Sequence, residues 1–178
     1  MSGDPVPGDV RRALEPEERI EHARALAWRA LNRRDRTVAE LARGLAAKRV
    51  ESDAIEVVVA ELCEQGYLDD AGYATRFADD RRRLDGWGAE RIERRLRELG
   101  VDPELIAAAI GDGAGELEAA LELLRRRFPD PPSTPRDRDR ALGVLVRKGY
   151  ELELAYDALR RHADAQGFDR HTDAPAFD

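Results

Sequence analysis

The spacing of apolar residues between Thr37 and Arg83 predicts two short helices, a tight turn and a third helix. Thr37 suits the N-cap of the first of these helices, and Glu40 three residues later can close a capping box with it. Gly66 ends the second helix, because glycine adopts the left-handed conformation of a C-cap at little cost. Short amphipathic helices cannot bury their apolar faces alone, so the three must pack on one another or on neighbours. Their apolar positions are Leu41 and Leu45, then Ile55, Val58, Val59 and Leu62, then Tyr73, Phe77 and Leu84.

The same pattern of apolar positions returns twice further along the chain. A shift of 51 residues places Leu45 on Leu96 and Val50 on Val101, and a further shift of 49 residues places Leu96 on Leu145. Repeats of about fifty residues are typical of stacked helical arrays. We therefore predict an all-α protein of three tandem three-helix repeats that form an elongated, curved array.

The boundaries of the repeats follow from this alignment and from the prolines. Four prolines in the seven residues 129–135 cannot be helical, so we expect a linker there, and a flexible point between repeats two and three. The terminal segments lack helical period and are expected to be flexible. The predicted parts are a tail at 1–16, repeats at 17–66, 67–111 and 112–165, and a tail at 166–178.

The composition agrees with a helical protein and indicates the cellular compartment in which it works. Of the 178 residues, 38% are charged and 6% are aromatic, and the mean hydropathy is −0.61. The one cysteine, Cys63, excludes a disulfide within the chain and favours a reducing compartment. No apolar run approaches the ~20 residues of a membrane span, and no signal peptide is visible. We expect a cytoplasmic protein that does not bind membranes.

No set of residues has the spacing of a catalytic, metal or cofactor site. The three histidines, His22, His162 and His171, are scattered and form no HExxH sequence, and no phosphate-binding glycine motif is present. Cys63 lies between Glu61 and Glu64, and acidic neighbours disfavour the thiolate that a nucleophile needs. We expect no catalytic residues, no bound metal and no cofactor.

The charges are divided into blocks. The net charge of −7 excludes a simple polycation that coats nucleic acid, yet residues 22–50 hold eight basic residues against two acids. Residues 51–72 hold seven acids and no base. Two interpretations stay open, namely pairing between the blocks within the chain, or a surface for a partner with both charge signs. The second predicts partner contacts at Arg29, Arg33, Arg34, Arg43, Lys48 and Arg49.

Several stretches together resemble the RecX family of bacterial recombination regulators. The opening helix with its two arginines, the Gly66-Tyr67-Leu68-Asp69-Asp70 turn, and the Gly86-Trp87-Gly88 segment before Arg91-Ile92 carry the resemblance. It covers roughly residues 18–110, and residues 115–163 share only the repeat pattern.

The resemblance implies a protein of tandem three-helix repeats without enzymatic activity. Proteins of this family bind the RecA recombinase, lie in the groove of its filament on single-stranded DNA, and restrain strand exchange and ATP hydrolysis. The implied partners are therefore the RecA filament and the single-stranded DNA within it, and the implied roles are DNA repair and SOS control by a monomer.

Two other functions fit parts of the sequence. Short helix pairs with arginines are also found in helix-turn-helix transcriptional regulators, which bind DNA directly. The other possible function is that of a helical scaffold protein.

Overall fold

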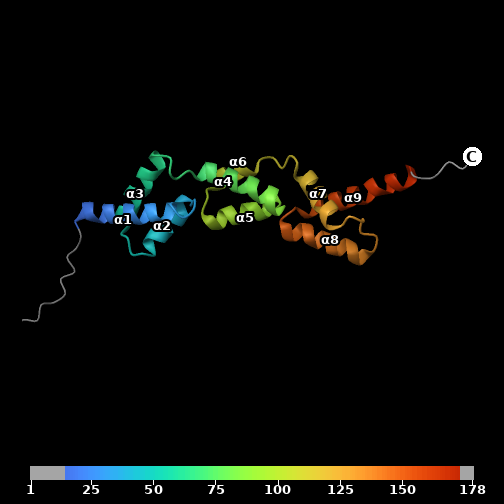
Figure 1. Ribbon diagram of the computed structural model, residues 1–178, viewed down its shortest axis with the longest axis horizontal. Coiled ribbons are helices and arrows are strands. Elements are labelled where there is room, and N and C mark those ends of the chain that lie inside the picture. The colour runs from blue at the N-terminus through green and yellow to red at the C-terminus, as the bar shows by residue number, and fades with distance from the viewer. Residues whose placement is uncertain (1–14, 173–178) are drawn as a thin grey trace, which may run out of the picture. The chain divides into compact units, whose positions relative to one another are not determined.

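The computed structural model describes residues 15–172 of the chain and the side chains of residues 15–164. All regular structure among these residues is helical (Figure 1), which confirms the predicted all-α class. Contacts divide the chain into two compact units, Met1–Asp69 and Asp70–Asp178. The predicted N-terminal tail lies outside the described residues up to residue 14. The elongated form of the array stays a prediction.

The first unit contains one three-helix repeat. Helix α1 (Pro16–Leu31) packs against α3 (Ser52–Glu64) and α2 (Val38–Ala46). Proline in the first turn and a capping box from Glu15 to Glu18 begin α1. Small residues on α1 let the larger side chains of α2 and α3 approach it closely. The buried core consists of Ala23, Ala27, Leu41, Leu45, Ala54, Val58, Leu62 and Leu68.

The second unit contains two more three-helix groups. Helices α4 (Asp70–Asp80), α5 (Ala89–Leu99) and α6 (Pro103–Ile110) form one, and a π-helical turn (Arg81–Asp85) extends α4. Tyr73 and Phe77 pack against its core as predicted, but the side chain of Leu84 is 66% exposed, so its assignment to that apolar face was wrong. The π-helical turn changes the direction of side chains after Asp80, which a uniform helical period does not anticipate.

Helices α7 (Glu116–Arg127), α8 (Pro135–Lys148) and α9 (Leu152–Thr172) form the third group. Helix α9 continues to Thr172, so the predicted start of a tail at residue 166 falls inside a helix. The Pro-rich run joins α7 to α8, within the third repeat, and therefore does not separate repeats two and three as expected. Pro132 is buried and its carbonyl oxygen accepts a hydrogen bond from Nε of Arg138 at 3.3 Å.

The turn that follows the second helix is the same in all three repeats. The amide of Val50 donates to the carbonyl of Leu45 at 3.2 Å, and Val101 donates to Leu96 at 3.1 Å. In the third repeat Tyr150 donates to Leu145 at 3.2 Å. These bonds join the residues that the sequence alignment superimposes, so the predicted triplication of a three-helix unit is confirmed.

Repeats two and three dock through their backbones inside the second unit. The amide of Gly88 donates to the carbonyl of Lys148 at 2.9 Å, and the amide of Glu90 donates to the carbonyl of Gly149 at 3.1 Å. A Cβ on Gly88 would lie 2.4 Å from the carbonyl oxygen of Gly149. Only glycine permits this approach, so the position of the third repeat against the second depends on it.

Candidate interaction surface

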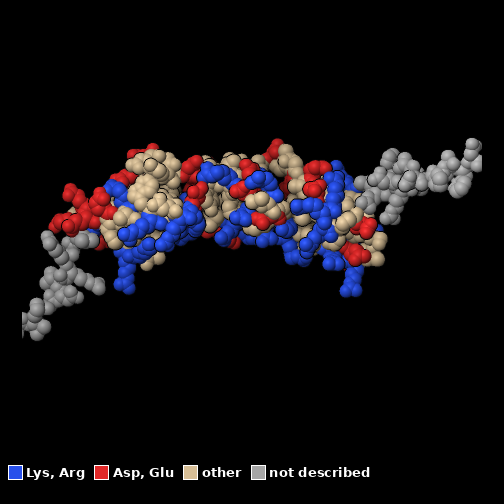
Figure 2. Space-filling model, in the orientation of Figure 1, with Lys and Arg blue, Asp and Glu red and all other residues tan. Residues whose placement is uncertain are grey.

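The structure brings three of the six predicted contact residues to one groove in the first unit. Arg29 at the end of α1, Arg33 just beyond it, and Lys48 after α2 line a groove of about 240 Å³ between the two helices. In Figure 2, Lys and Arg atoms gather over α2 and the end of α1. Arg36 lines the same groove. The sequence reasoning missed Arg36 as a site residue, because the loop after α1 turns it back toward the groove.

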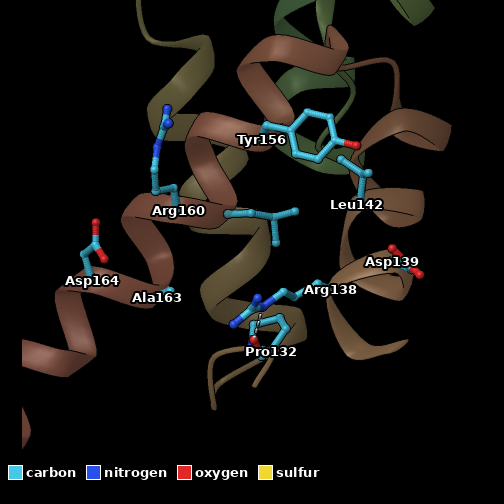
Figure 3. Close-up of a pocket in the computed structure, with 9 residues that line it drawn as sticks. Pro132, Arg138, Asp139, Leu142, Tyr156, Arg160, Ala163 and Asp164 are labelled. Carbon is cyan, nitrogen blue, oxygen red and sulfur yellow. Dashed lines mark hydrogen bonds between the residues drawn. The ribbon is translucent and has the colours of Figure 1, made fainter. Parts of the chain in front are cut away.

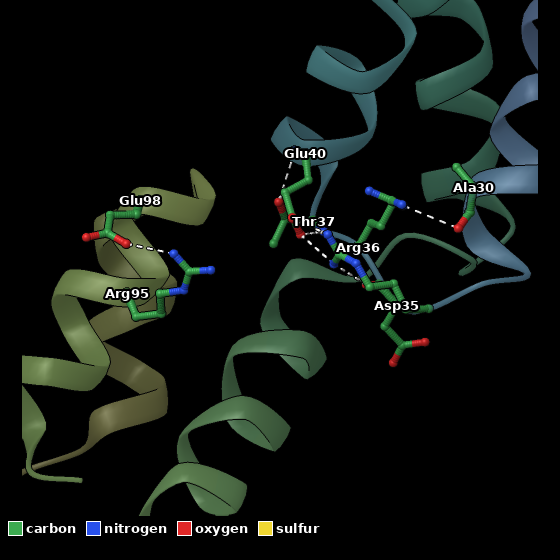
Figure 4. Close-up of polar contacts among 8 residues, drawn as sticks. Ala30, Asp35, Arg36, Thr37, Glu40, Arg95 and Glu98 are labelled. Atoms are coloured by element: carbon green, nitrogen blue, oxygen red, sulfur yellow. Dashed lines mark hydrogen bonds and ion pairs between the residues drawn. The ribbon is translucent and has the colours of Figure 1, made fainter.

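A capping box positions the chain at the edge of this groove. The amide of Glu40 donates to the hydroxyl of the buried Thr37 at 3.1 Å, and both halves of the predicted capping box are formed (Figure 4). Arg36 reaches back to α1, where its Nε donates to the carbonyl oxygen of Ala30 at 3.3 Å. These hydrogen bonds hold the C-terminal end of α1 close to the N-terminal end of α2 at the groove.

Arg34 has an internal role. Its Nη2 lies 2.6 Å from Oε1 of Glu40, a carboxylate whose side chain is 12% exposed. The hydrogen bond from Arg34 lowers the pKa of the Glu40 carboxyl below its ordinary value. A charged group engaged in this way is less available to a partner than a solvated one.

Arg43 and Arg49 are exposed but do not line the groove. Arg43 lies on α2 and Arg49 in the turn after it, where its φ of 62° is left-handed. The structure therefore divides the predicted set of contact residues. Arg29, Arg33 and Lys48 are gathered at the groove, and the other three do not line it.

Pairing between the charge blocks accounts for part of the pattern. Arg24 on α1 forms a forked ion pair with Glu61 on α3 at 2.9 Å, and Arg19 contacts Glu51 and Asp53 at the start of α3. Arg29, Arg33 and Lys48 have no carboxylate within ion-pair distance in the described part of the chain. Their positive charge is therefore left for solvent or for a partner.

A second cavity, of about 340 Å³, lies in the third repeat between α8 and α9 (Figure 3). Pro132, Leu142 and the half-exposed Tyr156 form its apolar wall, and Arg138 and Arg160 flank it. Nearby, the buried His162 places its Nε2 at 2.9 Å from the carbonyl oxygen of Phe128. That contact joins α9 to the end of α7, across 34 residues of sequence, and the sequence reasoning had no signal for it.

The described residues contain neither a metal-binding cluster nor a membrane-spanning helix. The side chains described between residues 15 and 164 include no group of three or more His, Cys, Asp or Glu that could hold a metal ion. Within residues 15–172 no helix combines the length and the apolar character needed to cross a membrane.

Comparison with known proteins gives consistent matches. The chain matches the family models of the first three-helix domain of RecX at residues 23–62 and of the second at residues 69–110. "Regulatory protein RecX" from Thermobifida fusca is 35% identical over 158 residues, which cover 85% of this chain and 84% of the relative. The protein of the same name from Stenotrophomonas maltophilia is 35% identical over 155 residues, covering 86% of this chain and 93% of that relative.

Solved structures agree in fold. The crystal structure of RecX from Lactobacillus salivarius superimposes with a TM-score of 0.72 at 19% identity, over 84% of this chain and 99% of that one. A second RecX crystal structure gives a TM-score of 0.67 at 20% identity, over 82% of this chain and 73% of that one. The fold, the domain matches and the extent of sequence identity lead to one assignment: this chain belongs to the RecX family of regulatory proteins.

Proposed function

We propose that this protein is a non-enzymatic regulator that binds the RecA recombinase on single-stranded DNA and restrains its recombinase and ATPase activities. Membership of a family of regulatory proteins is the observation that carries the proposal. We place the protein in the cytoplasm as a monomer, with roles in DNA repair and in SOS control.

The groove between α1 and α2 supports a surface-mediated function. Three cations without carboxylate partners among the described residues stand around apolar side chains from both helices. Such a surface suits a partner that presents negative charge beside apolar groups, because the charges direct the encounter and the apolar contacts hold the complex. We therefore propose Arg29, Arg33 and Lys48 as the principal contacts, with Arg43 and Arg49 at the periphery.

The proposal is tested by titrating the purified protein into RecA assembled on single-stranded DNA while ATP turnover is measured. We expect turnover to fall at substoichiometric ratios, because one bound regulator can act on several filament subunits. Unchanged turnover, together with no co-sedimentation with the filament, would exclude this function.

Two charge-reversal variants then test the surface. Arg29→Glu with Arg33→Glu should weaken inhibition at least tenfold, because like charges then face the partner. Arg136→Glu with Arg140→Glu, on the exposed side of α8, changes the net charge equally and should leave inhibition intact. Equal inhibition by both variants would retain the function and reject the groove. Arg34 is left unchanged, since its reversal would also break the pair with Glu40.

A further inference from the structure

A second basic groove lies in the other compact unit, where repeats two and three meet. Its volume is about 510 Å³, larger than the groove between α1 and α2. Figure 2 shows Lys and Arg atoms gathered over α7 and α8. The charged side chains that line it are five cations and one acid, namely Arg91, Arg126, Arg127, Arg147, Lys148 and Asp85. The chain as a whole has more acids than bases, so this concentration of positive charge is local.

Ion pairing within the protein does not account for these cations. The neighbouring Arg125 lies 3.6 Å from Glu118 and 3.8 Å from Glu122. In contrast, Arg127 and Arg147 have no carboxylate within ion-pair distance among the side chains of residues 15–164. Both lie in the last turn of a helix, where one cation suffices to balance the partial negative charge of the helix dipole. An excess of positive charge therefore remains in the groove.

The groove is held in shape by contacts between the two repeats. The guanidinium of Arg91 lies 4.2 Å from the centre of the Trp87 ring and donates to the carbonyl oxygen of Arg147 at 2.9 Å. Nζ of Lys148 donates to the carbonyl oxygen of Asp85 at 2.5 Å. Together with the close approach of Gly88 to the third repeat, these bonds place cations from both repeats on one surface before any ligand binds. Such preorganisation reduces the entropy lost on binding.

The internal repeat relates this groove to the one in the first unit. The groove in the first unit lies between the first and second helices of its repeat, α1 and α2, and the corresponding helices of the third repeat, α7 and α8, supply most of the lining of the second groove. The shifts that align the repeats place Gly44 on Val144 and Lys48 on Lys148, and all four residues line the grooves. The two compact units thus carry the same kind of surface at equivalent positions.

We infer that the groove between repeats two and three binds the phosphodiester backbone of a nucleic-acid strand, independently of base sequence. Arginine forks match the geometry of phosphate oxygens, and four of the five cations are arginines. The lining includes no aromatic side chain on which a base could stack, so contacts to the backbone are favoured. The inference deepens the proposed function, on which its biological setting rests, but it concerns direct contact with nucleic acid in the absence of RecA.

The test is a titration of the full chain against fluorescently labelled oligothymidylate, without RecA, at a series of salt concentrations. Arg127→Gln with Arg147→Gln removes two exposed charges at sites without ion pairs. The salt dependence of a single-strand complex has a slope of about 0.7 per phosphate contact, so we expect this variant to lower the slope by about 1.4 and the affinity several-fold. Arg127→Lys with Arg147→Lys keeps the charges and should keep the slope.

Arg136→Gln with Arg140→Gln is the matched control, since it removes two exposed charges of α8 that do not line the groove. An unchanged slope in the Arg127→Gln/Arg147→Gln variant, with native helicity by circular dichroism, would overturn the inference. The inference would also be overturned if the wild-type protein bound polyglutamate as tightly as oligothymidylate. That result would indicate an acidic protein partner. Inhibition of RecA without any binding to oligothymidylate would retain the proposed function and reject this site, so the two can fail separately.

Discussion

Tyr150 shows how one residue departs from its repeat equivalents. It occupies the position of Val50 and Val101, and its side chain is 1% exposed. Its hydroxyl is buried without a hydrogen-bond partner among the described residues. Burial, with a smaller contribution from the negative charge of Glu116, raises the pKa of the Tyr150 phenol to about 12.

This pKa shift predicts a loss of stability at high pH. The unfolded phenol ionises at about pH 10, whereas the folded one keeps its proton until about pH 12. Its contribution is therefore complete below pH 10, and the free energy of unfolding falls by roughly 3 kcal/mol as the pH rises through that window. Tyr150→Phe should lack this part of the decline and be at least as stable as the wild type near neutral pH, because an unpartnered buried hydroxyl is removed.

Urea denaturation of both proteins at about pH 8 and about pH 11 measures the difference. The lysines and the remaining tyrosines are the same in the two proteins, so their contributions to the decline in stability cancel in the comparison. Parallel declines in wild type and Tyr150→Phe would show that the phenol ionises freely in the folded state.

At the scale of the element, the turn after the second helix has a glycine at its left-handed position in two repeats and an arginine in the first repeat. Gly100 and Gly149 have φ values of 85° and 88°, and Arg49 at the equivalent position has a φ of 62°. A side chain in the left-handed region costs about 1 kcal/mol that glycine avoids. Arg49→Gly should therefore raise the free energy of unfolding of the first repeat by about 1 kcal/mol.

Chemical denaturation followed by circular dichroism measures this gain. Arg43→Gly, in the interior of α2, is the comparison, since glycine there should lower stability by about 1 kcal/mol. If both substitutions destabilise, the turn at Arg49 is relaxed and the left-handed conformation carries no cost. Arg49 is also a proposed partner contact, so a stabilised Arg49→Gly protein with weaker inhibition of RecA would separate its two roles.

At the scale of the whole molecule, the docking of repeats two and three depends on a contact between two backbones. A Cβ at position 88 would lie 2.4 Å from the carbonyl oxygen of Gly149. The atoms that it would meet belong to the backbone, so no flexible side chain can move aside to relieve the collision. Gly88→Ala should lower the free energy of unfolding of the second unit by about 3 kcal/mol, the upper range for overpacking. It should also disrupt the basic groove, because Arg91 and Lys148 approach it from different repeats.

Thermal unfolding and limited proteolysis between α6 and α7 measure these effects. Gly44→Ala is the matched control, since a Cβ there meets no atom within 4 Å and alanine favours the helix by about 1 kcal/mol. A Gly88→Ala protein with wild-type stability would mean that the repeats can separate without loss.

Local features were predictable from the sequence. The capping box of Thr37 and Glu40, the apolar positions of the second helices and the three copies of the turn were all identified, since each depends on residues within a few positions of one another. The family resemblance depended on the same local runs. Irregular features were the exceptions, as with the π-helical turn that exposes Leu84.

The surfaces were decided by tertiary structure. Arg24 pairs with Glu61 across 37 residues, so its charge is neutralised within the chain although it belongs to the basic block of residues 22–50. Arg91 donates to the carbonyl oxygen of Arg147 across 56 residues, a contact between repeats two and three that no pattern in the sequence indicates. Helical period is a property of neighbours along the chain, so the sequence determined the repeats. The availability of a charge depends on what lies a few ångströms away in space, and only the packing of the helices determined that.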